Sequence, residues 1–179
     1  MVSIEEIQAA YYMVAATGVM LAAVFYLLNL RETRRTRRID TANNLMQMLT
    51  CKEGARAWLE LLNMAWSDYD DFEKKYGTDY NLDNAVLRTH IWFTYDTIGH
   101  QVKKGLADLD TVYDSTGIFA LWMWRKFQPV IDEHRRRYVG SDMYRGWEYL
   151  AGEILKLKLE RDPSYKVPET FIKYIPNKL

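Results

Sequence analysis

The pattern of hydrophobic and charged positions changes abruptly after residue 30. From Ala9 to Leu30 the chain reads AAYYMVAATGVMLAAVFYLLNL, and these 22 residues include no charged side chain. As a helix they would extend about 33 Å, which matches a hydrocarbon core of about 30 Å. A buried helix of a soluble bundle, the alternative, normally carries a polar stripe. A cleaved signal peptide fits poorly because Glu5 and Glu6 make the leading segment acidic. The pattern therefore predicts a transmembrane helix over residues 9–30.

Five arginines follow this stretch directly: Arg31, Arg34, Arg35, Arg37 and Arg38. Because guanidinium groups cross a bilayer at high cost, we expect them to stay on the cytoplasmic side and to contact anionic lipid headgroups. We predict a single-pass protein of the inner (cytoplasmic) membrane, with its N-terminus outside and its C-terminal domain in the cytoplasm. The alternative for the RRTRR sequence is a nucleic-acid patch. Its position beside a membrane span disfavours that alternative, and we predict no nucleic-acid partner.

Hydrophobic periodicity then predicts helices beyond the arginines. No proline or glycine interrupts residues 19–53, so the first helix is expected to continue into the cytoplasm. A stripe at spacings of three and four, here called the juxtamembrane seam, comprises Ile39, Ala42, Met46 and Leu49. We expect this seam to face a partner, and the alternative is that it docks on the protein's own bundle. Gly54 marks an expected break, and a second amphipathic stripe follows from Ala55 to Ala65.

The remaining chain alternates between helix signals and breakers. Residues 67–81 are acidic and aromatic without a clear period, and we expect a long loop with room for a short turn of helix. Residues 83–104 are predicted to be helical, with Gly105 as the glycine cap. The next helix begins near Asp108 or Asp110 and passes through Pro129, and Ser141 or Asp142 is expected to cap the last.

These elements predict an all-α fold. One N-terminal transmembrane helix continues into a cytoplasmic bundle of four or five helices, and an extended tail follows because its prolines exclude a helix. The expected segments are an external N-terminus at 1–8, the transmembrane helix at 9–30, an Arg-rich juxtamembrane helix at 31–50, a helical domain at 51–160 and the tail at 161–179. The tail is expected to lie against an apolar surface through four residues: Tyr165, Phe171, Tyr174 and Ile175.

Candidate catalytic and metal-binding patterns are few. None of the three histidines stands three residues after a glutamate, and the single cysteine, Cys51, excludes a Cys-x-x-Cys site. Residues 79–90 open like a calcium loop but have Asn84 at the glycine position and His90 at the glutamate position, so we expect a helix cap. Asp96 and His100 lie one helical turn apart; a structural pair is favoured over a catalytic base with its orienting partner. We predict no catalytic residue, metal or cofactor, and identify no small-molecule substrate.

Small residues share one face of the predicted span. Ala15, Gly18 and Ala22 fall at positions i, i+3 and i+7. In lipid, helices associate where small residues allow their backbones to approach closely. We therefore expect this face to contact another membrane helix, from a second copy or from a different subunit, although alanine is common in spans that only anchor.

The middle of the chain resembles a family of bacterial and archaeal proteins of unassigned function. The resemblance lies in the segments YDTIGHQVKKGLADLDTVYDSTGIFALWMWRKFQPVIDEHRRRY and WEYLAGEI, and it extends over nearly the whole chain. The matching positions are Tyr95, Ile98, Gly99, Gly105, Leu106, Asp108, Val112, Tyr113, Gly117, Trp122 or Trp124, Pro129, Ile131 and Arg135 to Arg137. The resemblance implies an apolar N-terminal span, an arginine-rich junction and a helical domain. It implies no reaction.

The expected function follows from the architecture. We expect a non-catalytic, membrane-anchored protein that mediates protein–protein contacts at the cytoplasmic face, as an accessory or scaffolding subunit. One alternative is a membrane-anchored ligand sensor or enzyme, with Asp96 and His100 as its polar pair. The other is a self-assembling homo-oligomer.

Overall fold

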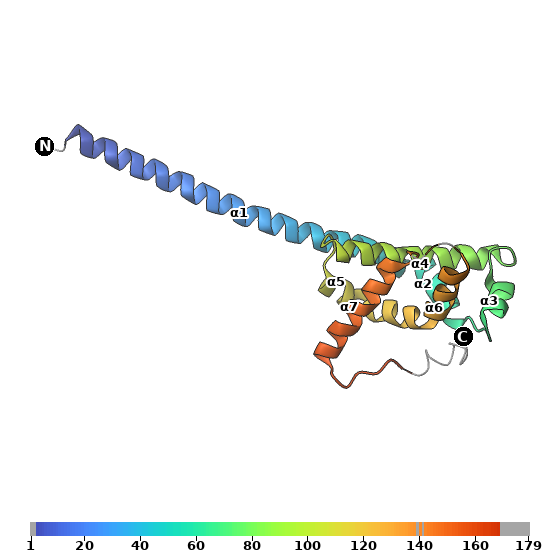
Figure 1. Ribbon diagram of the computed structural model, residues 1–179. Coiled ribbons are helices and arrows are strands. Elements are labelled where there is room, and N and C mark those ends of the chain that lie inside the picture. Colours follow the sequence, from blue (N-terminus) through green and yellow to red (C-terminus); the bar gives the residue numbers. More distant parts are fainter. Residues whose placement is uncertain (1–2, 139, 141, 169–179) are drawn as a thin grey trace. The chain divides into compact units, whose positions relative to one another are not determined.

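The computed structural model describes residues 3–138, 140 and 142–168. All regular elements in these ranges are helical, which confirms the all-α fold (Figure 1). The elements are α1 (Ile4–Thr50), α2 (Lys52–Asn63), α3 (Tyr69–Tyr76), α4 (Leu82–Lys103), α5 (Leu109–Val112), a π-helical turn η1 (Tyr113–Gly117), α6 (Ile118–Arg137) and α7 (Arg145–Arg161). The chain divides into two units, Met1–Arg38 and Ile39–Leu179.

The first unit contains the apolar part of α1. Ser3 and Glu6 form a reciprocal capping box, in which Ser3 N donates to Glu6 Oε2 (2.9 Å) and Glu6 N donates to Ser3 Oγ (3.2 Å). Every residue from Ser3 to Asn29 is exposed. By length and composition, α1 is a candidate membrane span.

The second unit begins at Ile39 and so includes the last turns of α1. The break between the first two helices is at Cys51, three residues before the expected glycine. Cys51 caps α2, with its Sγ accepting a hydrogen bond from Gly54 N at 3.3 Å. Gly54 instead permits close packing, since a Cβ atom there would overlap the carbonyl oxygen of Met48. Gly54 therefore lies inside α2 because the Met48 carbonyl leaves no room for a side chain, and not because a helix ends there.

The predicted loop at residues 67–81 contains an eight-residue helix, α3. The Asp68 side chain caps it by accepting from Asp71 N (2.8 Å), while Lys74 and Lys75 occupy its last turn. Asn81 likewise caps α4, with its Oδ1 accepting from Asn84 N at 3.1 Å. The calcium-like sequence is thus a helix start, as expected.

The core of the second unit forms where α4 crosses α7. A Cβ atom on Gly99 would overlap the carbonyl of Gly146, so the two glycines allow the two backbones to touch. Trp147 is fully buried beside this contact and stacks on Tyr95, with 5.2 Å between ring centroids. Gly105 directly follows Lys104, the C-cap residue of α4, and has φ +67°. This is the left-handed conformation expected of a glycine that terminates a helix.

The last helices differ in detail from the prediction. Asp108 caps α5, as expected, by accepting from Thr111 N at 3.0 Å. Pro129 lies inside α6, and α7 begins at Arg145, later than predicted. Of the tail residues expected to contact apolar surface, Tyr165 packs against the core and accepts a hydrogen bond from Trp122 Nε1 (2.8 Å). Phe171, Tyr174 and Ile175 lie outside the described residues.

Candidate functional site

The residues predicted to contact lipid or another membrane helix are exposed in the first unit. All five arginines of the junction (Arg31, Arg34, Arg35, Arg37 and Arg38) present their side chains to the surroundings. Ala15, Gly18 and Ala22 are exposed as well, and a Cβ atom on Gly18 would meet no atom within 4 Å. The face of small residues is therefore open in the single chain.

The juxtamembrane seam is buried within the second unit. Ala42, Met46 and Leu49 are at most 7% exposed and belong to the hydrophobic core, and Ile39 is half-buried. Of the two interpretations of this seam, docking on the chain's own domain agrees with this burial. Ala42, Met46 and Leu49 are thus covered by the chain's own fold, while Ile39 remains partly accessible.

Asp96 and His100 do lie close together, with 3.5 Å between Asp96 Oδ2 and His100 Nε2. The second carboxylate oxygen of Asp96 accepts a hydrogen bond from Trp147 N (3.0 Å) in the first turn of α7. Tyr144, the N-cap residue of α7, makes no side-chain capping bond of its own. Asp96 therefore acts as a cap supplied by a neighbouring helix, which is a structural role.

Lys126 is a buried lysine that no pattern in the sequence indicated. Its side chain is fully buried on α6, and its Nζ donates to the carbonyls of Leu62 and Met64 (2.7 Å to the latter) at the end of α2. Burial lowers the pKa of Lys126 to about 7. An ammonium group that donates to the last carbonyls of a helix stabilises that end, so the contact joins α2 to α6.

A second set of largely buried polar side chains, Arg88 and His134, lies between α4 and α6. Arg88 is 5% exposed, donates to the carbonyl of Tyr76 (2.7 Å) and lies over the ring of Phe72. Desolvation lowers the pKa of His134 to about 4, and the positive charges of Arg88 and Arg137 add to this effect. The imidazole is consequently neutral at pH 7.

The outer face of α4 is an exposed apolar surface of the second unit. Although α4 is buried on its core side, three large apolar residues on its other side are exposed: Leu82 (63%), Val86 (58%) and Phe93 (54%). A helix that is apolar on both sides normally has a neighbour on both sides. The outer face of α4 has no such cover in the described chain.

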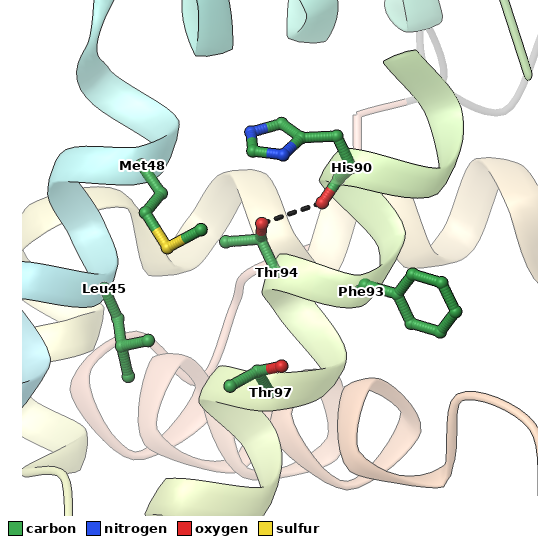
Figure 2. Close-up of a pocket in the computed structure, with 6 residues that line it drawn as sticks. All are labelled: Leu45, Met48, His90, Phe93, Thr94 and Thr97. Carbon is green, nitrogen blue, oxygen red and sulfur yellow. Dashed lines mark hydrogen bonds between the residues drawn. The ribbon is translucent and has the colours of Figure 1, made fainter. Parts of the chain in front are cut away.

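Two hollows follow this face. The first, about 240 Å³, lies between the end of α1 and α4 (Figure 2). Figure 2 shows Leu45 and Met48 on the α1 side, with His90 pointing toward α1 and Phe93 on the far rim. The hydroxyl of Thr94 donates its proton to the His90 carbonyl (2.7 Å), so within the hollow it can act only as an acceptor.

The second hollow, about 350 Å³, continues toward the start of α4 and shares His90 with the first. Its other lining residues are Thr78, Leu82, Ala85, Val86 and Thr89. We call the two hollows together the α4 groove. No residue that lines it carries a carboxylate, an ammonium or a guanidinium group.

The sequence contained a signal for this groove. Leu82, Val86 and Phe93 lie on one face at helical spacing, and Leu87, Ile91, Tyr95 and Ile98 form a second apolar stripe on the opposite face. Two apolar stripes on one helix indicate two packing surfaces. Metal chemistry has no comparable support, since the described residues contain no cluster of three potential His, Cys, Asp or Glu ligands.

Comparison with known proteins places the architecture in a family. A family model described as a domain of unknown function, DUF4760, matches residues 13–154. The chain belongs to the DUF4760 family. No curated protein and no solved structure matches it. The DUF4760 match begins inside the apolar part of α1 and ends inside α7, so it includes the arginine junction and the α4 groove.

Proposed function

We propose that this DUF4760 protein is a non-catalytic, single-pass protein of the cytoplasmic membrane whose helical domain docks another protein along the α4 groove. It acts as an accessory or scaffolding subunit. The observation that carries the proposal is the exposure of more than half of Leu82, Val86 and Phe93 on a helix whose opposite side is core. Contiguous exposed apolar surface of this kind is typical of interaction sites.

The membrane anchor is supported by α1. Its apolar stretch is exposed from Ala9 to Asn29. Burial of that surface in lipid would therefore favour the membrane-inserted state of the helix. The five exposed arginines after it favour an orientation with the helical domain in the cytoplasm. The first turn of α1, at the other end of the apolar stretch, carries the acidic residues Glu5 and Glu6. These residues do not hold that end on the cytoplasmic side, as basic residues would.

The occupant we propose for the groove is an amphipathic helix of a second membrane-complex subunit. From Leu82 to Thr97 the groove extends about 22 Å at ~1.5 Å per residue, enough for about four helical turns. Its uncharged lining suits the apolar face of such a helix. Exposed Asp79 and Asp83 lie at one end and exposed Lys104 at the other, so the docked helix should carry basic residues opposite the first end and acidic residues opposite the second.

The test is photocrosslinking of the full-length protein in native membranes. A photoreactive amino acid in place of Phe93 should form specific protein adducts, and Val86→Asp should abolish them. The same photoreactive residue in place of Lys156, on the exposed side of α7, is the matched control and should form none.

Each result discriminates among the candidates. Adducts to a different membrane protein support the proposal, and adducts to a second copy of this chain favour the homo-oligomer instead. Equal adduct yields at positions 93 and 156, or none at 93 while the protein is still membrane-bound, would refute docking at the α4 groove.

A further inference from the structure

A separate apolar hollow of about 360 Å³ lies in the second unit, among the end of α1, α2, α4 and α6. We call it the α2 hollow. Its floor is Tyr95, which is 1% exposed and held in place by stacking on Trp147. One wall is an edge-to-face pair, Trp58 and Phe119, whose ring centroids are 5.0 Å apart. The volume falls within the range of about 300–1,000 Å³ that is usual for small-molecule sites.

The rim of the α2 hollow is apolar and open. Leu59 is 54% exposed and Phe119 is 38% exposed, although both are large hydrophobic residues. Leu49 and Ala55 complete the apolar lining, and the residues that the structure describes leave the space open. Burial of an apolar group there would stabilise the complex in proportion to the apolar area removed from water.

The chemistry of the lining selects an uncharged ligand. No acidic or basic side chain lines the hollow, and its hydroxyl groups are those of Thr50 and Tyr95. Burial raises the pKa of Tyr95, which keeps its phenol neutral. A charged ligand would lose its hydration without gaining a counter-ion. A hydrocarbon chain has no such cost.

We infer that the α2 hollow binds one hydrocarbon chain of a membrane lipid. The inference rests on the membrane anchoring in the proposed function, but it does not depend on the α4 groove. Thr50, which lines the hollow, lies 12 residues after Arg38 in sequence. Because these 12 residues belong to α1, they extend about 18 Å at ~1.5 Å per residue, so the proposed anchor holds Thr50 within that length of the arginine junction and close to the cytoplasmic leaflet. There, lipid chains are the most abundant apolar ligands.

The experiment uses the full-length protein in nanodiscs of phosphatidylcholine that carries a diazirine on one acyl chain. After irradiation, peptide mapping should find adducts in residues 9–30 and, separately, at the lining of the α2 hollow. Ala55→Trp, which fills the hollow, should lower the second set at least fivefold and leave the first unchanged. Gly152→Trp, at an exposed position of α7 with no atom within 4 Å of an added Cβ, is the control and should change neither set.

A second variant guards against a folding defect in the first. Leu59→Glu places a charge on the rim at an already exposed position and should also lower the adducts at the hollow. Adducts in residues 9–30 alone, or adducts at the hollow that both variants leave unchanged, would overturn the lipid site while retaining the anchor. Absence of adducts in residues 9–30 would instead overturn the anchor and, with it, this inference.

Discussion

The carboxylate of Asp96 on α4 accepts a hydrogen bond from the backbone N–H of Trp147 on α7, 3.0 Å away. Because Tyr144 supplies no capping bond, this contact satisfies a donor that the first turn of α7 would otherwise leave unpaired. We predict that Asp96→Ala lowers the free energy of unfolding by about 1–2 kcal/mol. Asp96→Asn, which retains an acceptor oxygen, should lose less. Equal losses in urea titrations of the two variants would contradict the capping role.

The contact between Gly99 and Gly146 gives a second prediction. Gly99→Ala forces the backbones of α4 and α7 apart and should lower the free energy of unfolding by about 1–3 kcal/mol. Gly152→Ala, in the same helix as Gly146 but exposed, is the matched control and should stabilise the protein by about 0.5–1 kcal/mol. Thermal or urea unfolding of both variants measures the difference. A neutral Gly99→Ala would show that the two helices can separate at no cost.

His134 should make stability depend on pH. Its pKa is lowered to about 4 in the folded state, below the value of about 6.5 in an unfolded chain. Between these values the unfolded state binds more protons, so stability is retained above pH 6.5 and lost as the pH falls toward 4. The imidazole side chain is 17% exposed, and the loss is at most about 3 kcal/mol.

The pH dependence also involves the groups around the imidazole. Glu73 Oε1 lies 3.4 Å from His134 Nε2. The charge of Glu133 favours the protonated imidazole, whereas Arg88 and Arg137 oppose it. Comparison with His134→Gln, which cannot titrate, isolates the histidine contribution. If urea titrations at pH 7.5 and pH 5 give the variant the same pH dependence as the wild type, His134 is not its source.

Topology provides a fourth prediction. A reporter fused after Leu179 should be cytoplasmic, because the arginines follow the span. Replacement of Arg31, Arg34, Arg35, Arg37 and Arg38 by glutamine should give mixed orientations. Protease accessibility in intact cells distinguishes the two sides. An externally accessible C-terminus in the wild type would show that the predicted orientation is wrong.

Association within the bilayer is the fifth prediction. Gly18→Leu should weaken crosslinked or native-gel assemblies, because the added side chain blocks close backbone approach while the span stays hydrophobic. Leu21→Ile preserves the size of a residue that is already exposed and serves as the control. If Gly18→Leu inserts normally and its assembly is unaltered, α1 is an anchor only.

Local signals in the sequence predicted much of the helical architecture. The helix cap within residues 79–90, the cap at Asp108 and the Gly105 terminator depend on neighbours within a few residues, and the structure confirms all three, with Asn81 supplying the first. The position of Gly54 was misjudged because its role depends on Met48 in the preceding helix. Similarly, the start of α7 could not be located because its cap comes from α4.

The candidate sites were less accessible to sequence analysis. Periodicity identified the seam of Ala42, Met46 and Leu49 as apolar, but only the tertiary structure shows that the chain itself covers it. Conversely, the sequence does not distinguish Phe93 from the other apolar residues of its helix. Phe93 is exposed because the opposite stripe, with Tyr95 and Ile98, is the one buried in the core. The α2 hollow combines residues from four helices, so no local pattern indicates it.

The tryptophans of this chain provide a spectroscopic means of observing one unit alone. All six lie between Trp58 and Trp147, and the apolar part of α1 has none. Trp66, Trp92, Trp124 and Trp147 are buried, and ring contacts connect Trp147 to both Trp92 and Trp124. Tryptophan emission of the full-length protein, excited where tyrosine does not absorb, therefore reports the packing of the helical domain, while the apolar part of α1 contributes no signal.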